Sequence, residues 1–373
     1  RAVIDLAAIA SNVASLHARS RPAQLMAVVK ADAYGHGLVP VARAAVSAGA
    51  TWLGTAQIPE ALQLRAAGFT TRIMSWLFSP NTDLRPALAA DIDLSASSPW
   101  AVEQIAAAAR DVGIVARIHL KADTGLGRAG STSAEFDRLI ETVLTAQRAG
   151  GVRVVGVWTH YALADDPGNA TISAQDEVFA NAIDQVTAAG IDLEVRHCSN
   201  SAATLTKPGV GYDLVRPGLA VYGLSPIPAV ASPAELGLRP AMTLEADLTL
   251  VKQVPAGTGV SYGLTYTTPT ATKLGLVPLG YADGIPRHAS NVAPVAVGGR
   301  RTKIAGRVCM DQFVIDLGPD ATEQPGDTVT LFGPGDNGEP TAEDWAVAAD
   351  TISYEIVTRI GVRVPRVYVG GEA

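Results

Sequence analysis

Several residue types and patterns are scarce in this sequence, and each scarcity argues against a class of protein. There are only two cysteines, Cys198 and Cys309, so the chain lacks the framework of a disulfide-stabilised secreted domain and fits a reducing compartment, the cytoplasm. No apolar run approaches the roughly 20 residues that cross a bilayer, so no membrane segment is expected. A net charge of −7 argues against a broad nucleic-acid-binding surface. The numbering begins at Arg1 rather than at a methionine, which leaves a removed leader open.

The length of 373 residues, 48% of them hydrophobic, predicts two globular domains. Over residues 1–238, short apolar runs alternate with alanine-rich segments that have helical spacing and mostly end in glycine. Eight strand-like runs separated by helices predict a (β/α)8 barrel. The runs are LMAVVK (25–30), WLGTA (52–56), IMSWL (73–77), IDLSA (92–96), ARIHLK (116–121), VVGVWTH (154–160), LEVRHC (193–198) and YDLVRP (212–217).

An open, doubly wound sheet is the competing interpretation of this alternation. It would need a glycine-rich dinucleotide turn after the first run, and ADAYGHG (31–37) does not have the GxGxxG spacing. Near Pro240 the pattern changes to strands separated by Gly, Pro and Asp, with one helix at 341–360 that Thr341 and Asp344 open as a capping box. Residues 239–373 are therefore predicted to form a mostly β domain. Its predicted strands lie at 242–254, 273–280, 293–299, 302–310, 312–318 and 327–333.

Reactive side chains follow the predicted barrel strands, where enzymes of this architecture have their active sites. The chain has six lysines against 23 arginines, yet Lys30 and Lys121 both end apolar runs. His160, His197 and Arg216 occupy similar positions. A lysine at a barrel mouth can form a Schiff base, because desolvation lowers its pKa and exposes a neutral amine. The alternative for Lys30 is a surface lysine at a strand edge.

Two late segments are candidates for binding a phosphate group. HCSNSAAT (197–204) opens a helix with small hydroxyl and amide residues, and VRPGLAVYG (215–223) brings Gly218 where its backbone can approach an anion. Each segment alone fits an ordinary loop. Because both follow the last two predicted strands, together they indicate a site for a phosphorylated cofactor.

Nine blocks of the sequence occur in the order found in alanine racemases, and on them the chain resembles that family over nearly its whole length. The resemblance implies fold-type III pyridoxal 5'-phosphate chemistry, interconversion of L-alanine and D-alanine that supplies D-alanine for peptidoglycan, a barrel followed by a β domain, and a head-to-tail homodimer. The blocks are AVVKADAYGHG (27–37), HLKADTGLGRAG (119–130), THYALADD (159–166), HCSNSAA (197–203), VRPGLAVYG (215–223), VSYGLTY (260–266), GYADG (280–284), GRVCMDQ (306–312) and DTISYEIVTRIGVRVPR (350–366).

The resemblance also implies a role for each matching residue. Lys30 would hold the cofactor and act as a base on one face of the substrate, and Tyr262 of the partner subunit would act on the opposite face. Arg216 would face the pyridine nitrogen, and His160 would bond to both Arg216 and Tyr262. Lys121 matches a position that many members carbamylate, where it orients Arg128. The cofactor phosphate would be held by Tyr34, Ser201, Gly218, Leu219 and Tyr354, and the substrate by Arg128, Met310, Asp311 and Tyr281, the last at the pocket entrance.

The proposed chemistry needs these residue types. Racemisation requires a proton donor and a proton acceptor on opposite faces of the α-carbon, because a single base that returns its proton regenerates the starting enantiomer. The pKa values of lysine and tyrosine are ordinarily about 10.4 and 10, so the site must lower both. Arg216 keeps its own proton, so a pyridine nitrogen beside it stays unprotonated, which suppresses transamination.

Other interpretations stay open at this point. A decarboxylase of the same fold would need an acidic group in place of Arg216, and a non-catalytic cofactor carrier would not need the β domain. Lys121 can instead pair with Asp123, and Tyr262 and His160 can be ordinary strand and core residues. We interpret Cys309 as packing, His36 and His197 as structural, and no spacing indicates a metal site. The breadth of substrates beyond alanine is open, although Trp76 is a candidate to narrow the pocket.

Overall fold

The computed structural model describes residues 1–207 and 212–371 and divides into two compact units. The barrel unit comprises Ala10–Ala33 and Val41–Leu238, and the sheet unit comprises Arg1–Ile9, Tyr34–Pro40 and Arg239–Ala373. In the sequence-based division, 1–9 and 34–40 fall within residues 1–238; that division stays a prediction. Among the described residues, no helix is both long and apolar enough to cross a membrane.

The barrel unit is built around eight parallel strands in the order β8-β7-β6-β5-β4-β3-β2-β9. The two outer strands approach each other, since the N–H of Asp213 donates to Arg196 O at 3.0 Å and the N–H of Arg216 donates to Ser199 O at 2.9 Å. The predicted (β/α)8 architecture is therefore confirmed, and the open doubly wound sheet is excluded. The strands are β2 (Gln24–Val28), β3 (Trp52–Gln57), β4 (Arg72–Leu77), β5 (Asp93–Ala96), β6 (Ala116–Lys121), β7 (Val152–Trp158), β8 (Val195–His197) and β9 (Leu214–Val215).

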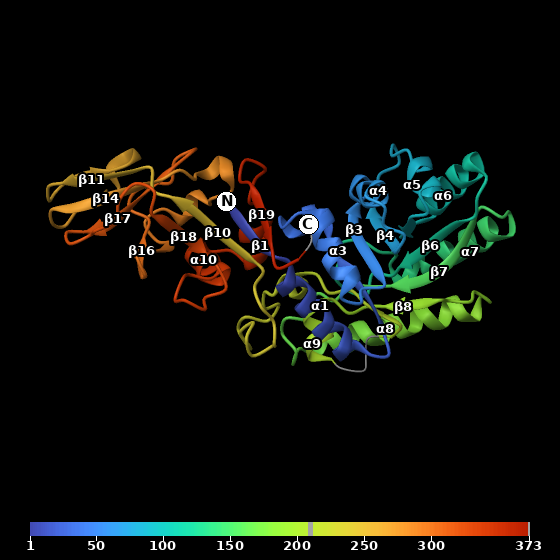
Figure 1. Ribbon diagram of the computed structural model, residues 1–373. Helices are drawn as coiled ribbons and strands as arrows, with labels where there is room; N and C mark the ends of the chain where they lie inside the picture. The colour runs from blue at the N-terminus through green and yellow to red at the C-terminus, as the bar shows by residue number, and fades with distance from the viewer. Residues whose placement is uncertain (208–211, 372–373) are drawn as a thin grey trace. The chain divides into compact units, whose positions relative to one another are not determined.

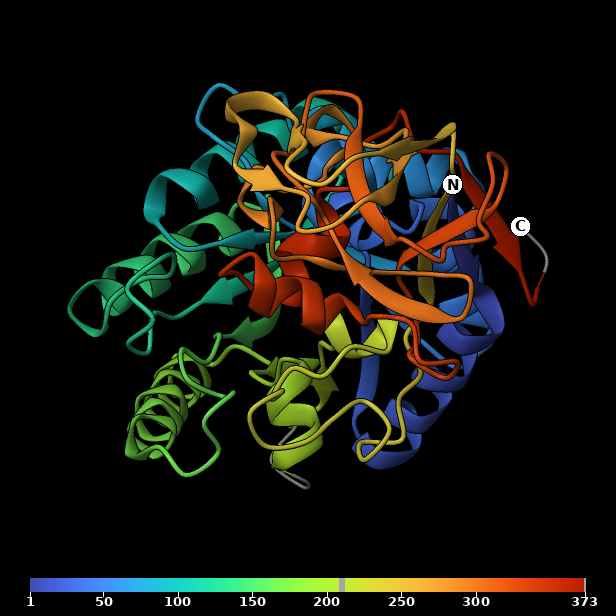
Figure 2. The ribbon, with the colours of Figure 1, turned by 90° about the vertical axis from the view of Figure 1, so that its left-hand side faces the viewer.

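Helices lie along the outer side of these strands (Figures 1 and 2). Local sequence explains their ends: α6 has Pro99 in its first turn and Gly113 in a left-handed conformation after its last. The interior is filled by side chains from several strands, including Met26, Trp52 and Trp158, so the barrel is a packed core rather than a pore. The helices are α1 (Leu6–Ser20), which begins in the sheet unit, α3 (Leu38–Ser47), which also begins there, α4 (Ile58–Ala66), α5 (Arg85–Ala89), α6 (Pro99–Val112), α7 (Ser133–Arg148), α8 (Ala170–Ala188) and α9 (Ser201–Thr206).

The sheet unit is mostly β, as predicted. Its larger sheet has the order β16-β15-β18-β10-β1-β19, and a three-stranded sheet has the order β11-β14-β17. The strands are β1 (Ala2–Asp5), β10 (Met242–Asp247), β11 (Leu250–Val254), β12 (Gly259–Val260), β13 (Tyr266–Thr267), β14 (Thr272–Val277), β15 (Pro294–Val297), β16 (Arg300–Lys303), β17 (Phe313–Gly318), β18 (Thr328–Phe332) and β19 (Arg366–Val369).

Three local predictions for this unit were wrong. The predicted strand 242–254 is two strands, β10 and β11, which belong to different sheets. Of the predicted strand 302–310, only residues 302 and 303 belong to a strand, at the end of β16. The predicted helix 341–360 is two helices, α10 (Ala342–Ala348) and α11 (Ser353–Thr358), because Asp350 between them adopts a φ of 52° that an α-helix cannot continue through. The capping box of Thr341 and Asp344 does open α10.

Candidate active site

Lys30 follows β2 in a left-handed turn, α2 (Lys30–Tyr34). Ala31, Asp32 and Ala33 have φ of 56°, 53° and 52°, a conformation that costs about 1–2 kcal/mol for each residue with a side chain. Glu60 on α4 supports the turn, because its Oε1 accepts from the N–H of Ala31 at 2.5 Å and from that of Asp32 at 3.4 Å. A carboxylate from a neighbouring helix therefore holds the segment that carries the lysine.

The surroundings of Lys30 favour its neutral amine. Burial lowers the pKa of the Lys30 amino group, and the positive charge of Arg128 lowers it further. The carboxylate of Glu60 opposes both effects without cancelling them. A lysine whose pKa is depressed has a larger neutral fraction, which is the form that attacks a carbonyl carbon or accepts a proton.

Lys121, at the end of β6, is also buried, and its Nζ lies 4.3 Å from the ring centroid of Trp158. Burial, followed by the charges of Arg216 and Arg128, lowers the pKa of Lys121 to about 8. The negative charge of Asp123 opposes this shift only in part. A substantial neutral fraction of this amine therefore exists at slightly alkaline pH.

Asp123, the alternative partner that the sequence offered for Lys121, organises its own loop. Its Oδ1 accepts from the N–H of Gly125 at 3.0 Å and from that of Gly127 at 3.1 Å. The same loop folds back on β6, because the N–H of Ser131 donates to Lys121 O at 2.9 Å. This geometry fixes the segment that carries Arg128, whose side chain is exposed.

Arg216 follows β9 and is 5% exposed. Its Nη1 lies 3.1 Å from His197 Nδ1, and its Nη2 donates to Thr159 O at 2.7 Å and to Cys198 O at 3.2 Å. A longer contact of 3.5 Å joins Nη2 to His160 Nδ1. Burial lowers the pKa of Arg216 to about 10, so the guanidinium keeps its charge near neutral pH.

His160 lies among several positive charges. Burial lowers the pKa of its imidazole well below the ordinary value, and the charges of Arg216 and Arg128 lower it further. Lys121 and Lys30 act in the same direction. The structure thus brings four of the predicted cationic residues within electrostatic reach of one neutral imidazole at the barrel end. Such a cluster matches the charge of an anionic ligand.

Ser201 and the segment after Arg216 form a compact hydrogen-bonded cluster. Ser201, the first residue of α9, is buried, and its Oγ accepts from the N–H of Gly218 at 2.8 Å and from that of Ala220 at 3.2 Å. Leu219 lies between Gly218 and Ala220 and begins the short 3-10 helix η1 (Leu219–Tyr222). Three of the predicted phosphate-binding residues are therefore neighbours in space.

The other two predicted phosphate-binding residues lie in the sheet unit. Tyr34 is buried, and its ring centroid lies 6.2 Å from that of Tyr354 on α11. A side chain at Gly35 would place its Cβ 2.5 Å from Val357 O, so this position must be glycine for the two segments to approach. Burial and the nearby Tyr354 raise the pKa of Tyr34, which keeps its hydroxyl protonated and able to donate.

Tyr262 lies in the 3-10 segment η2 (Tyr262–Leu264) of the sheet unit and is 71% exposed in the single chain. The residue before it, Ser261, has a φ of 61°, and its hydroxyl donates to Arg307 O at 2.6 Å. A Cβ at Gly306 would lie 2.6 Å from Val260 O. A strained, tightly packed loop therefore presents the predicted second base to solvent.

Tyr281, Met310 and Asp311 are brought together in the same unit. The N–H of Tyr281, which begins the 3-10 segment η3 (Tyr281–Asp283), donates to Cys309 O at 3.0 Å, and the N–H of Ala282 donates to Met310 O at 2.9 Å. Arg363 joins the two segments through ion pairs with Asp283 at 3.2 Å and Asp311 at 2.8 Å.

Gly280 permits this approach, and we expect Gly280→Ala to disrupt it. The new Cβ would lie 2.3 Å from Met310 O, closer than atoms can pack, so one of the two segments must move. We expect a loss of about 2 kcal/mol in unfolding free energy, as for other overpacked sites, together with a higher KM for the substrate of the predicted pocket. Thermal unfolding and steady-state kinetics measure the two effects. Gly361→Ala is the control, because its nearest new contact is an ordinary 3.4 Å; equal behaviour of the two variants would contradict the prediction.

Sequence reasoning did not identify several residues that support this site. Glu60, His119 and Asp93 received no role, and His197 was interpreted only as structural. One signal was available for two of them: Asp93 and His119 interrupt apolar barrel strands, and a buried polar side chain requires a partner. Among the residues that the structure describes, no group of three or more His, Cys, Asp or Glu side chains forms a candidate metal site.

Comparisons with known proteins agree with this geometry. Residues 4–226 match the family model for the N-terminal domain of alanine racemase, and residues 241–368 match the model for its C-terminal domain. An alanine racemase of Beutenbergia cavernae is 59% identical over 371 residues, which cover 100% of this chain and 98% of that protein. One of Streptomyces coelicolor is 59% identical over 374 residues, covering 99% and 95%.

Solved structures give the same result. The crystal structure of alanine racemase from Streptomyces lavendulae has a TM-score of 0.98 at 57% identity, covering 100% of this chain and 97% of that one. The Bacillus anthracis enzyme, solved with bound L-Ala-P, has a TM-score of 0.91 at 36% identity, covering 99% and 95%. The family resemblance of the nine sequence blocks is thereby confirmed. The chain belongs to the alanine racemase family.

Proposed function

We propose that this chain interconverts L-alanine and D-alanine with pyridoxal 5'-phosphate as cofactor and with Lys30 and Tyr262 as the two groups that exchange the α-proton. The observation that carries the proposal is the position of Lys30. In a barrel of this family, it follows a strand in a supported turn, with a depressed amine pKa and with Arg128 near it.

The residues of the barrel unit fit this cofactor. Its aldehyde requires a lysine with an accessible neutral form, which the lowered pKa of Lys30 favours. Its phosphate requires hydroxyl and backbone N–H donors. Ser201 Oγ accepts from the N–H of Gly218, which leaves the hydroxyl proton of Ser201 to donate, and the Gly218 N–H can turn from Ser201 to the phosphate. Arg216 supplies a charged donor for the pyridine nitrogen, whose protonation an acidic residue there would instead promote. When bound, the cofactor delocalises the negative charge that develops on the α-carbon.

The chain's own residues then bind the substrate and move its proton. We propose that Lys30 Nζ accepts or donates the α-proton on one face of the substrate and that the Tyr262 hydroxyl does so on the other. Arg128 orients the substrate carboxylate. His160 is kept neutral by burial and by its cationic neighbours; because its Nδ1 faces Arg216 Nη2, its Nε2–H can donate to the oxygen of Tyr262. Leu219, Tyr34 and Tyr354 complete the phosphate donors, and Met310, Asp311 and Tyr281 line the substrate pocket.

We propose a homodimer in which each active site takes Tyr262, Met310, Asp311 and Tyr281 from the partner subunit. Exposure in the single chain supports this arrangement: Tyr262 is 71% exposed, Met310 53% and Tyr281 45%. Large apolar side chains exposed together commonly mark an interaction surface. In this proposal, association of two chains removes these side chains from water and completes both sites.

A cytoplasmic role in supplying D-alanine for peptidoglycan completes the proposal. Cys198, which is buried, and Cys309, which is partly buried, do not form a disulfide, which fits a reducing compartment.

Incubation with L-alanine in deuterium oxide tests the proposed reaction. The protein, supplied with pyridoxal 5'-phosphate, should form D-alanine and incorporate deuterium at the α-carbon, both measurable by chiral chromatography with mass spectrometry. Serine, lysine and arginine, assayed in parallel, define the substrate range. Release of carbon dioxide, or an α-hydrogen that does not exchange, would contradict the proposal.

We predict that Lys121 forms a carbamate. The reaction joins a neutral amine to carbon dioxide and releases a proton. Because the pKa of Lys121 is lowered to about 8, its neutral form is abundant at pH 8. The carbamate signal should grow as the pH rises through this value. Carbon-13 NMR of protein equilibrated with labelled bicarbonate should show it, and Lys121→Ala should lack it. Lys252→Ala, which removes an exposed lysine, is the control and should retain the signal.

A further inference from the structure

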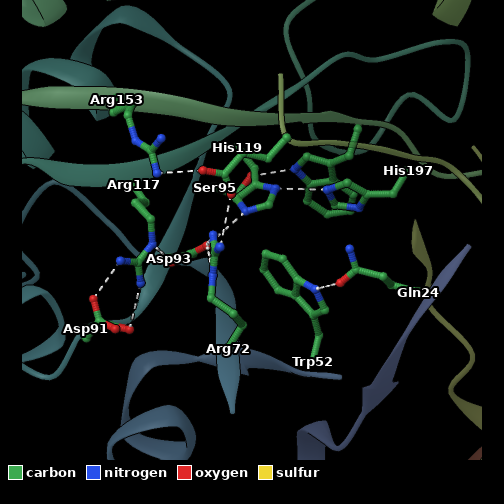
Figure 3. A network of polar contacts seen from close by, with 12 residues as sticks. Gln24, Trp52, Arg72, Asp91, Asp93, Ser95, Arg117, His119, Arg153 and His197 are labelled. Carbon is green, nitrogen blue, oxygen red and sulfur yellow. Dashed lines mark hydrogen bonds and ion pairs between the residues drawn. The ribbon is translucent and has the colours of Figure 1, made fainter. Parts of the chain in front are cut away.

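A continuous chain of polar side chains crosses the interior of the barrel unit from Arg216 (Figure 3 shows it from His197 onward). His197 Nδ1 lies 3.1 Å from Arg216 Nη1, and His197 Nε2 lies 2.9 Å from His119 Nδ1. His119 Nε2 lies 3.3 Å from Asp93 Oδ2. His197, His119 and Asp93 are each 0% exposed, so water does not compete for these bonds.

The hydrogen bonds between these side chains can run in only one direction, from Arg216 towards Asp93. A guanidinium has no acceptor atom, so Arg216 Nη1 donates and His197 Nδ1 must be without a proton. The proton of neutral His197 is then on Nε2, which donates to His119 Nδ1. His119 in turn has its proton on Nε2 and donates to Asp93. Burial, and then the charge of Arg216, lower the pKa of His197 far below its ordinary value, which agrees with a neutral ring.

The far end of the chain is an ionised carboxylate. Burial would raise the pKa of Asp93, but the bond from His119 and the charge and bond of Arg72 together lower it below its ordinary value. Arg72 pairs with Asp93 Oδ2, and Arg117 Nε donates to Asp93 Oδ1 at 2.7 Å. Because Asp93 begins β5, the negative charge lies at the opposite end of the barrel strands from Arg216, which follows β9.

Aromatic rings enclose the two histidines and offer them no competing hydrogen bond. The ring of Trp158 stacks on that of His197, with 5.7 Å between the ring centroids, and Trp52 packs edge to face against His119, with 5.6 Å between the centroids. Both indole N–H groups are used elsewhere, that of Trp158 on Ser95 Oγ at 2.9 Å and that of Trp52 on Gln24 Oε1 at 2.8 Å (Figure 3).

The backbone also accommodates this chain. A Cβ at position 156 would lie 2.3 Å from His119 Nδ1, the atom that accepts from His197. Gly156 on β7 therefore makes room for His119 within the barrel wall. A polar chain that needs its own glycine and two tryptophan neighbours is a built feature rather than an accident of core packing.

We propose that Asp93 and His119 are positioning residues for Arg216. Asp93 fixes the proton of His119 on Nε2, His119 fixes that of His197 on Nε2, and the bare Nδ1 of His197 then holds Arg216 as a charged donor in one orientation. The importance of this positioning for catalysis rests on the proposed function, in which Arg216 faces the pyridine nitrogen. Without the hydrogen bonds from Asp93 through His119, the His197 proton can move to Nδ1, where it repels the guanidinium of Arg216.

Nitrogen-15 NMR of the unsubstituted, cofactor-loaded protein labelled only at its six histidines tests the donor assignment directly. His119→Gln and His197→Asn assign the two signals by their loss. We expect both rings to be neutral, with Nδ1 bare and Nε2 protonated. A proton on Nδ1 of either ring, or a doubly protonated His197, would overturn the proposal.

Two substitutions of His119 separate positioning from packing. Glutamine can accept from His197 with its oxygen and donate to Asp93 with its nitrogen, whereas phenylalanine fills similar space without either bond. We expect His119→Phe to lower kcat for alanine by about 10- to 100-fold, as loss of a supporting bond commonly does, with KM changed less than about threefold. His119→Gln should stay within about fivefold of the unsubstituted protein and keep the His197 proton on Nε2.

The outcomes are distinct from failure of the proposed function. If the protein has no racemase activity, the NMR result for the unsubstituted protein still decides the donor assignment. Equal loss of kcat in the Gln and Phe variants, both shown to be folded by thermal unfolding, would overturn the positioning role. If the Phe variant does not fold, a Gln variant that loses the His197 tautomer overturns it as well, and one that keeps both tautomer and activity supports it.

Discussion

Lys30→Ala should lose racemase activity by a factor of about 10⁴ or more, because no other group can take its place on that face of the substrate. The same variant should lack the visible absorbance of covalently held cofactor. Lys30 has a lowered pKa in a turn supported by Glu60, so its removal deletes the reactive amine without touching the barrel core. Absorbance spectra, borohydride reduction and a chiral assay measure the effect.

The matched control for this variant is Lys252→Ala, which removes an exposed lysine from β11 and should leave both spectrum and activity unchanged. Circular dichroism must show that the Lys30 variant retains its fold. A Lys30→Ala protein that still binds the cofactor covalently, or that racemises alanine at a comparable rate, would remove the basis of the whole assignment.

A mixture of Lys30→Ala and Tyr262→Phe chains should recover activity that neither variant has alone. If each site takes its lysine from one chain and its tyrosine from the other, a mixed dimer has one site with both defects and one intact site. Random exchange makes about half of the dimers mixed, so about one quarter of the original activity should return. Mass spectrometry of the intact dimers and the chiral assay measure exchange and recovery.

Each variant taken through the same exchange with itself is the control and should stay inactive. Size-exclusion chromatography establishes beforehand that both variants are dimers. Mixed dimers that form in the expected proportion yet show no activity would place both bases in one chain and refute the shared site.

The sequence predicted the barrel well because its strands carry strong local signals. Each of the eight runs from LMAVVK to YDLVRP overlaps an observed strand, since continuous apolar runs bounded by helices are typical of buried parallel strands. The sheet unit was less predictable. β1 and β19 were missed because a four-residue strand such as AVID has too little pattern of its own, and its pairing partners are more than 200 residues away or at the other end of the chain.

For the candidate site, residue types at strand ends indicated Lys30, Lys121, His160 and Arg216, which the structure places near one another. Partners that act at a distance in sequence could not be predicted. Glu60 supports the Lys30 turn from a helix that begins after the next strand, and Asp93 on β5 contacts His119 on the neighbouring strand β6. Such contacts depend on which strands pair and in which register, and a linear pattern of residue types does not encode these directly.

The placement of β1 has a consequence for the biosynthesis of the chain. This strand pairs with β10 on one side and with β19 on the other, so it is synthesised long before the two segments that satisfy its edges. At 5–20 residues per second, roughly 10–50 s separate the synthesis of β1 from that of β10. During that interval the barrel strands can pair, whereas β1 exposes two open edges to other nascent chains. We therefore expect chaperone dependence to concentrate on β1, and truncation near Arg366 to raise aggregation by leaving one edge of β1 permanently open.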